Sequence, residues 1–368
     1  MAELVELLRR LAETPGVAGF EEEMMLRTRA ELEDAVDEVR IDNWGNVIGT
    51  KRGSDARAPS VMLAAHIDEP ALIVKYIDDA GFIRPERQGF PHMLALSGER
   101  VLIHTGKGPV RGVVGLKGLH MFYLESSISA SGKMEVPAMR DMYIDVGAES
   151  RAQVLEMGID VGNPISLERG ISFLGNPSYV TGKALDNRAP LAVMLEAMNR
   201  LSGEVLPSTI YAVGTVMEEI GHRGIIMSAY QLSPSILLAF DITVCGDTPD
   251  AHIADFPHRM GHGPTVKLMD VIMGATGLTA HPKIVRWLID AAEAAGVPYQ
   301  KEVIMGLNTD ASTGHMQRGG IPAGAISIPC RYSHGPSEVV NLDDLENGVR
   351  LLVAALRSLP ADFSLARV

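Results

Sequence analysis

Apolar strand-like runs alternate with amphipathic helical spacing along most of this chain, and this alternation limits the folds open to it. The run Val61–Ala65 is typical of a buried central strand. Beyond it the pattern predicts a strand and helix series at about 187–202 (helix), 209–216 (strand), 222–231 (helix), 235–240 (strand), 281–295 (helix), 325–328 (strand) and 342–358 (helix). A sheet covered by helices is the arrangement that such alternation favours.

A long middle stretch lacks this alternation of strands and helices. Between about residues 70 and 178 short β-type pieces are punctuated by Gly, Pro and Asp, and helical spacing is scarce. Because strands and helices alternate on both sides of this stretch, we expect one α/β domain that is discontinuous in sequence. The expected boundaries are residues 1–69 and 179–368 for the α/β domain, and residues 70–178 for an inserted β-rich domain.

Charge and cysteine content exclude several classes of protein. Lys and Arg number 33 against 46 Asp and Glu, a net charge of -13, which disfavours nucleic acid or an anionic membrane as the main partner. Two cysteines, Cys245 and Cys330, cannot form a disulfide framework, so a reducing cytoplasmic location is expected. No apolar run is long enough to span a bilayer, and the N-terminal residues mix charges into helical spacing, unlike a signal peptide.

Two adjacent carboxylates, Glu218 and Glu219, follow the expected strand at 209–216. The carboxyl ends of strands are where open α/β sheets build their sites. Neighbouring residues of a regular strand point to opposite faces, so both can serve one site only where the strand breaks, and Gly221 offers such a break. One carboxylate could then hold a metal while the other handles a proton. Taken alone, the pair is better explained as two solvated glutamates at a strand end.

Four further polar residues stand at expected strand ends or loops: His66, Asp186, Asp241 and His334. Each has an ordinary reading, namely a core histidine, a helix N-cap, a residue that stops a strand, and a solvated loop side chain. With Glu219 they make two imidazoles and three carboxylates, the ligands of a paired divalent site in which one carboxylate spans both ions. Nitrogen and oxygen ligands without thiolate suit zinc, cobalt or manganese. Asp68 is suitably spaced to orient the His66 ring.

Five motifs that contain these residues follow one another along the chain, and together they are highly specific. They are Ala65-His66-Ile67-Asp68-Glu69, Gly182-Lys183-Ala184-Leu185-Asp186-Asn187-Arg188-Ala189, Glu218-Glu219-Ile220-Gly221-His222-Arg223-Gly224, Asp241-Ile242-Thr243 and Ser327-Ile328-Pro329 through His334. Over nearly its whole length the chain resembles the glutamyl/tetrahedral (TET-type) aminopeptidases, dinuclear metallopeptidases often named endoglucanase homologues. The resemblance implies an α/β fold, a three-layer α/β/α zinc-peptidase-like catalytic domain with an inserted β-rich, PDZ-like dimerisation domain.

The resemblance also implies a role for each site residue. Asp186 would bridge two divalent ions, zinc or alternatively cobalt or manganese. His66 and Asp241 would complete the shell of one ion, and Glu219 and His334 that of the other. Glu218 would be the general base that deprotonates the metal-bridging water, and Asp68 would orient His66. A cis peptide is expected at Asp186-Asn187.

Substrate and assembly follow from the same resemblance. The expected activity is removal of N-terminal residues from short peptides, in a homo-oligomer whose dimers assemble into a tetrahedral dodecamer. Residues 308–311 are expected beside the substrate. We expect His120 to be a structural or inter-subunit residue and Cys245 and Cys330 to be buried small hydrophobes. Five other histidines are expected to be surface or pocket residues without metal: His222, His258, His262, His281 and His315.

Two other functions are alternatives to an aminopeptidase. A glycoside hydrolase could use Glu218 and Asp241 as acid and base, but it has no use for His66 and His334. Aromatic residues make up only 5% of the chain, which is thin for a cleft that stacks sugars. A non-catalytic peptide-binding scaffold based on the β-rich insert is the second alternative.

Overall fold

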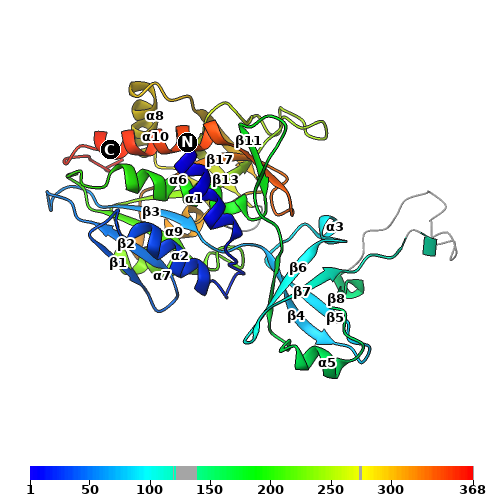
Figure 1. Ribbon diagram of the computed structural model, residues 1–368. Coiled ribbons are helices and arrows are strands. Elements are labelled where there is room, and N and C mark those ends of the chain that lie inside the picture. The colour runs from blue at the N-terminus through cyan, green and yellow to red at the C-terminus, as the bar shows by residue number, and fades with distance from the viewer. Residues whose placement is uncertain (119, 122–138, 273–275, 368) are drawn as a thin grey trace. The chain divides into compact units, whose positions relative to one another are not determined.

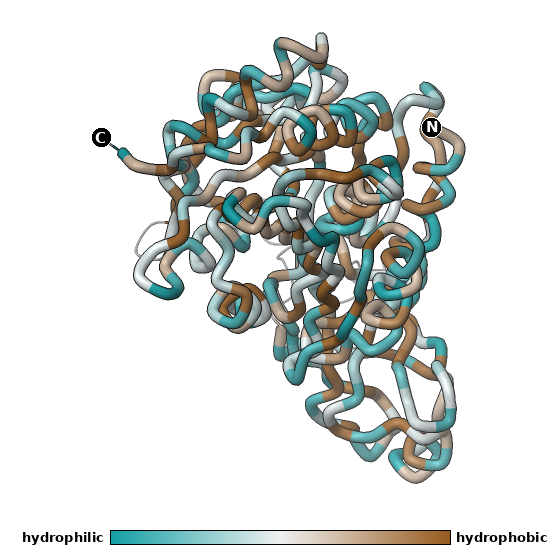
Figure 2. Tube along the Cα trace, turned by 90° about the vertical axis from the view of Figure 1, so that its left-hand side faces the viewer, coloured by the Kyte–Doolittle hydropathy of each residue, from teal (hydrophilic) through white to brown (hydrophobic). Residues whose placement is uncertain are grey.

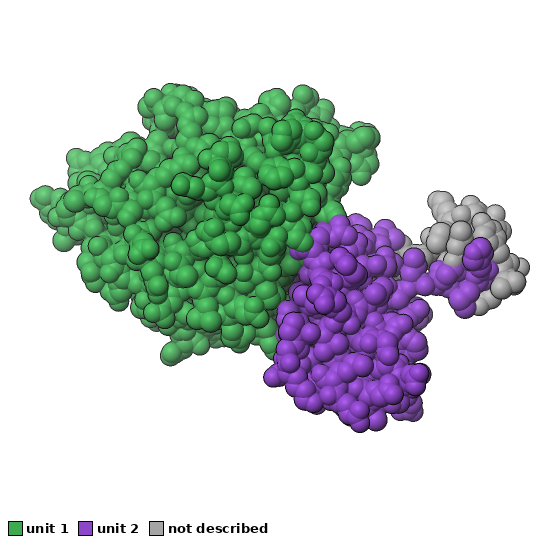
Figure 3. Space-filling view, viewed as in Figure 1, with its two compact units in different colours: residues 1–69, 170–333, 337–368 green, residues 70–169, 334–336 purple. Residues whose placement is uncertain are grey.

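A computed structural model describes residues 1–118, 120–121, 139–272 and 276–367 (Figure 1). The chain forms two compact units, drawn green and purple in Figure 3. The first contains residues 1–69, 170–333 and 337–368, and the second contains residues 70–169 and 334–336. Apolar segments, brown in Figure 2, run through the interior of the larger unit.

The first unit is built on a 12-stranded sheet. Its main path runs β1-β2-β12-β3-β13-β17-β18-β11-β10, and the four strands at its centre, β12, β3, β13 and β17, are parallel. The strands of this path are β1 (Glu38–Ile41), β2 (Val47–Lys51), β3 (Val61–His66), β10 (Ser172–Phe173), β11 (Tyr179–Gly182), β12 (Ile210–Thr215), β13 (Ile236–Val244), β17 (Ala323–Arg331) and β18 (Glu338–Asn341). Three further strands extend the sheet beside β17: β14 (Thr265–Val271), β15 (Gly277–Thr279) and β16 (Gln300–Met305).

Helices cover both faces of this sheet, because alternate residues of the central strands feed two separate apolar cores. Val61, Leu63 and Ala65 of β3 pack in the core that contains the first helix group, whereas Met62 and Ala64 pack in the core of the second. The first group is α1 (Ala2–Glu13), α2 (Glu22–Leu32), α6 (Leu185–Arg200), α8 (Pro282–Ala294) and α10 (Leu342–Ser358). The second is α7 (Arg223–Leu232) and α9 (Ala311–Gly314), with the 3₁₀ turn η2 (Gln317–Gly319) beside α7.

The second unit is a closed barrel with strand order β4-β5-β8-β7-β6-β9. Its elements are β4 (Ala71–Ile77), β5 (Ile83–Gln88), α3 (Met93–Leu96), β6 (Arg100–Thr105), β7 (Gly108–Val114), η1 (Met139–Asp141), β8 (Ile144–Asp145), α5 (Arg151–Glu156) and β9 (Pro164–Leu167). The barrel has its own apolar core, which includes Val74, Ile103 and Ile165. The β-rich character expected for this stretch is present, whereas its PDZ-like character stays a prediction.

The chain returns to the first unit at Gly170, earlier than the expected residue 179, because β10 pairs with β11 in the large sheet. Strands β14 and β15 were not anticipated by the sequence pattern. Among the described residues, no helix has both the length and the apolar composition needed to cross a membrane.

Candidate metal centre

Neighbouring parallel strands at the centre of the sheet carry the first two candidate ligands. β3 ends at His66, and Asp241 lies inside β13, which continues to Val244 rather than stopping at Phe240 as expected. Both side chains are buried, with 2% of His66 and 6% of Asp241 exposed. His66 Nε2 is 3.3 Å from Asp186 Oδ1. His66, Asp186 and Asp241 each place one possible ligand atom within 4.8 Å of the others.

Glu218 and Glu219 reach the same region from β12, whose last residue, Thr215, pairs with His66. One ligand atom each of His66, Glu218 and Glu219 also lie within 4.8 Å of one another. The strand breaks at Met217, which has a left-handed φ of 54°, so the expected break at Gly221 comes too late in the chain. Gly221 is used in the turn that leads into α7, with a φ of 115°. The break before the pair brings both carboxylates to one site.

Asp68 lies behind this group and is fully buried. Its Oδ1 is 3.5 Å from His66 Nδ1, on the side of the ring away from Asp186. The same carboxylate accepts the backbone N–H groups of Glu218 and Glu219, each at 3.0 Å. Asp68 holds the backbone of both glutamates, which the sequence did not indicate, and its orientation of His66 stays a prediction.

Asp186 stands where α6 begins with a kink. The backbone of Asp186 and Asn187 is not helical, and the peptide between them is cis, as the resemblance implied. Glu338 accepts the N–H of Asp186 at 2.9 Å, and the Asn187 side chain donates to the carbonyl of Phe240 at 2.8 Å. These two bonds fix the start of α6 to β18 and to β13, next to Asp241.

A buried ion cluster ties α6 to the end of β3. Lys183 Nζ is 2.8 and 2.7 Å from the two carboxylate oxygens of Glu69, and Arg188 is 3.8 Å from the same group. Arg188 also donates to the carbonyl of Ile67. The positions of His66 and Asp186 are thus coupled by buried charge pairs.

The electrostatics of the group match a site that holds a cation. Burial raises the pKa of Asp241 well above its usual range, and the charge of Asp186 raises it further. Burial lowers the pKa of His66, but Glu218, Asp186 and Asp68 surround the ring and raise that pKa overall. Clustered carboxylates repel one another, and a bound cation stabilises them by removing that repulsion. Imidazole and carboxylate together are a donor set that suits zinc, cobalt or manganese. The residues fit a divalent metal ion.

His334 belongs to the segment 334–336 of the second unit, so its position relative to the carboxylates stays a prediction. Within that unit its Nδ1 is 2.9 Å from the carbonyl of Phe90, and its own carbonyl accepts the N–H of His92 at 2.9 Å. A proton on Nδ1, donated to Phe90, leaves the lone pair on Nε2, which is the tautomer that a metal ligand needs.

His222 lies beside Glu218, where the sequence predicted only a surface or pocket residue without metal. It is buried, and its Nδ1 is 3.0 Å from Glu218 Oε1 and 3.9 Å from Asp310 Oδ1. Its Nε2 is 2.8 Å from the Asn308 amide. Burial lowers the pKa of His222, but Glu218 and Asp310 raise it to about 11. The signal was its position four residues after Glu218, across the glycine turn.

Several other histidines and the two cysteines differ in their exposure to solvent. His120 and His262 are exposed, and His262 Nδ1 is 3.1 Å from the carbonyl of Met260. His258 and His281 are buried, which excludes the surface alternative of the expected surface or pocket position. Both cysteines are free and buried, as expected.

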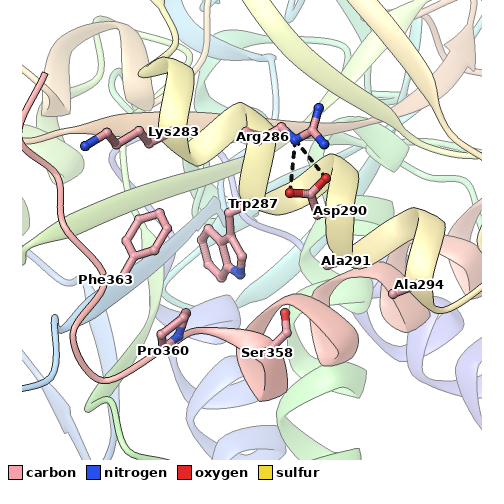
Figure 4. Close-up of a pocket in the computed structure, with 9 residues that line it drawn as sticks. All are labelled: Lys283, Arg286, Trp287, Asp290, Ala291, Ala294, Ser358, Pro360 and Phe363. Atoms are coloured by element: carbon pink, nitrogen blue, oxygen red, sulfur yellow. Dashed lines mark hydrogen bonds and ion pairs between the residues drawn. The ribbon is translucent and has the colours of Figure 1, made fainter. Parts of the chain in front are cut away.

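A pocket of about 460 Å³ lies elsewhere in the first unit, between α8 and the chain that follows α10 (Figure 4). Trp287 and Phe363 face each other there with ring centroids 6.0 Å apart. Its lining includes no histidine and one carboxylate, Asp290, which is paired with Arg286. It is not a candidate for the metal centre.

Comparison with known proteins gives one consistent family. The model of the M42 glutamyl aminopeptidase family matches residues 45–351. A putative aminopeptidase of Acetivibrio thermocellus is 35% identical over 354 residues, which cover 96% of this chain and 98% of that protein. The solved structure of aminopeptidase APDkam598 from Desulfurococcus kamchatkensis is 38% identical with a TM-score of 0.91, covering 98% and 96% of the two chains.

A third similar structure is the Pyrococcus horikoshii TET1 peptidase, described as able to assemble into a tetrahedron or a large octahedral shell. It is 28% identical with a TM-score of 0.83, and the match covers 97% of this chain and all of that one. Because the family model spans most of the sequence and the relatives match from end to end, the chain belongs to the M42 glutamyl aminopeptidase family and is a peptidase hydrolase of the aminopeptidase type.

Proposed function

We propose that the protein is a metal-dependent aminopeptidase that removes N-terminal residues from short peptides, with Glu218 as the general base. The observation that carries this proposal is that His66 is grouped with Asp186 and Asp241 and also with Glu218 and Glu219, and that the Glu218 side chain is only 11% exposed. A hydrolytic metal site needs ligands and also a proton acceptor that is not used up as a ligand.

Two divalent ions, zinc or alternatively cobalt or manganese, would be held by the donor set expected from the sequence. Asp186 would lie between them, with His66 and Asp241 on one side and with Glu219 and His334 on the other. Bound there, the ions would make water more acidic and polarise the scissile carbonyl. Support comes from the buried, mutually repelling carboxylates and from the Asp68 and Phe90 contacts that orient the two imidazoles.

Glu218 is suited to proton transfer by its surroundings. In the metal-free protein burial raises the pKa of its carboxyl, but the charges of His222 and His66 lower it overall, so the group is ionised at neutral pH. Oε1 faces His222 at 3.0 Å, and Oε2 faces His66 at 3.9 Å. In the proposed reaction Oε2 takes the proton of the attacking water and returns it to the nitrogen of the leaving amine.

The test uses protein stripped with a chelator and then supplied with zinc, cobalt or manganese. Hydrolysis of acidic, basic and neutral aminoacyl-p-nitroanilides should vanish on stripping and return with at least one metal. A glycoside hydrolase that used Glu218 and Asp241 would survive chelation, and a peptide-binding scaffold would show no turnover with any metal. Inactivity on every substrate with two ions bound per subunit would refute the proposal.

We also propose that the protein is a cytoplasmic homo-oligomer in which dimers build a tetrahedral dodecamer. The assembly described for the TET1 relative supports this, as do the large apolar side chains that the second unit exposes, among them Phe90 at 64% and Leu94 at 57%. Light scattering after size-exclusion chromatography would give the mass. A monomer of 39.6 kDa at micromolar concentration would contradict the assembly proposal.

A further inference from the structure

The segment that carries Glu218 and Glu219 is held by an unusual set of hydrogen bonds. Four consecutive backbone N–H groups, from Val216 to Glu219, each donate to a side-chain oxygen rather than to a backbone carbonyl. The acceptors are Asn46 Oδ1 for Val216 (3.2 Å), Glu21 Oε1 for Met217 (3.0 Å), Asp68 Oδ1 for Glu218 (3.0 Å) and Asp68 Oδ2 for Glu219 (3.0 Å). The three acceptor residues are at most 2% exposed, so water does not compete for these donors.

The carbonyls of the same segment are also satisfied. Val216 accepts the N–H of Gly224, Met217 accepts that of Arg223, and Glu218 accepts those of Gly221 and His222. The loop is therefore held from both sides, from α7 through its carbonyls and from the three side chains through its amides. This matters because Met217 has a left-handed φ of 54°, a conformation that costs a non-glycine residue free energy and persists only where the surroundings enforce it.

Glu21 is the most distant of the three acceptors in the sequence, 196 residues from Met217. It precedes α2 and is 1% exposed. Its Oε1 also accepts the N–H of Gly19 at 2.8 Å, so one oxygen connects the N-terminal turn to the strained residue. Burial, together with the nearby Asp68 charge, raises the pKa of Glu21 to about 7. Either protonation state leaves Oε1 able to accept a hydrogen bond.

Asn46 joins both ends of the same loop. Its Oδ1 accepts the N–H of Val216, and its Nδ2 donates to the carbonyl of Gly224 at 3.1 Å and to Asp42 at 2.8 Å. An aspartate in this place could not make the two donations, and an alanine would leave three polar groups without these bonds.

We propose that Glu21 and Asn46 are positioning residues for catalysis, which act through Met217 and Val216 to keep the adjacent carboxylates of Glu218 and Glu219 directed into one site. This inference rests on the proposed function, in which one carboxylate is the base and the other a ligand. Asp68 holds the two glutamates themselves, while Glu21 and Asn46 hold the residues where β12 breaks. Without them the chain can relax toward a regular strand, in which neighbouring side chains point to opposite faces.

The first measurement is hydrogen–deuterium exchange by mass spectrometry on metal-free protein, which needs no activity. In Glu21→Ala the amides of 216–219 should exchange about tenfold faster or more, because a buried hydrogen bond to the Glu21 carboxyl group is lost. Glu21→Gln should stay close to wild type, since its amide oxygen can still accept from Met217. Glu23→Ala, an exposed neighbour on α2, is the matched control, and peptides of β13 serve as the internal reference.

The second measurement is steady-state kinetics with saturating metal. Glu21→Ala and Asn46→Ala should lower kcat about tenfold or more with KM nearly unchanged, and Glu21→Gln should restore kcat. Should Glu21→Ala not fold, Glu21→Asp, which withdraws the oxygen by one methylene, is expected to show the same exchange and kinetic changes. A folded Glu21→Ala protein with wild-type exchange at 216–219 and wild-type kcat would overturn the inference. Faster exchange in a protein whose wild type has no peptidase activity would instead refute only the proposed function.

Discussion

Replacing Asp68 by asparagine tests the hydrogen bonds at the base of the site with a change of one atom. In the wild type the two carboxylate oxygens accept the N–H groups of Glu218 and Glu219 at 3.0 Å each, and the side chain is fully buried. An asparagine offers one acceptor oxygen and one NH₂ group. Whichever way its amide is turned, one backbone N–H faces another donor and loses its bond.

The magnitude follows from that loss. A buried hydrogen bond to a charged group contributes about 1.5 to 3 kcal/mol, and an orphaned buried donor costs about 1 to 3 kcal/mol. We expect Asp68→Asn to lower the free energy of unfolding by about 2 kcal/mol. Asp68→Ala, which orphans both donors, should lower it by about 3 to 5 kcal/mol.

The assay is urea denaturation of the chelator-treated protein, so that metal binding does not contribute to the difference. Asp34→Asn, an exposed aspartate of the same unit, is the control for the change of charge. An Asp68→Asn protein within about 0.5 kcal/mol of wild type would refute the reasoning, because that is the effect expected of a surface substitution.

Four further predictions concern the site. Glu218→Gln should lower kcat by about 10² to 10⁴ with metal content unchanged by atomic absorption, and a loss of metal instead would make Glu218 a ligand. In His222→Leu the pKa of Glu218 should rise, because the imidazolium that lowers it is gone. The acid limb of the pH profile of kcat/KM should therefore move to higher pH. An acid limb at the wild-type pH would contradict the effect of His222 on Glu218. Because the folded pKa of His222 is raised to about 11, its stabilising contribution is present near pH 6.5 and is lost as the pH rises toward 11, so the stability difference between wild type and His222→Leu should shrink over that range. Chelation should lower the melting temperature and added zinc should restore it, since the ion removes repulsion among the carboxylates; an unchanged melting temperature would argue against a metal at Asp186 and Asp241.

Much of the fold could be predicted from local pattern. The spacing of Leu4, Leu7, Leu8 and Leu11 predicts α1 nearly to the residue, and all four side chains are buried on one face. Helix α10 begins after Asn341, whose side chain accepts the N–H groups of Asp343 and Asp344, an N-cap that its residue type suits. The pattern did not predict β14, because Lys267 and Asp270 make this buried strand look polar in the sequence. Both side chains are buried, and Lys267 forms ion pairs with Asp270 and with Glu302.

By itself the sequence determined the residue types of the site, the sheet that would carry them and the family resemblance, because burial periodicity and motif spacing are local properties. Tertiary structure alone decided that β12 breaks at Met217, that His222 faces Glu218, and that Glu21 reaches Met217 from 196 residues away. The physical reason is that a strand-end side chain meets whichever segments the strand order places beside it. That order, β12-β3-β13-β17, results from packing across the whole sheet and cannot be predicted from any single stretch of residues.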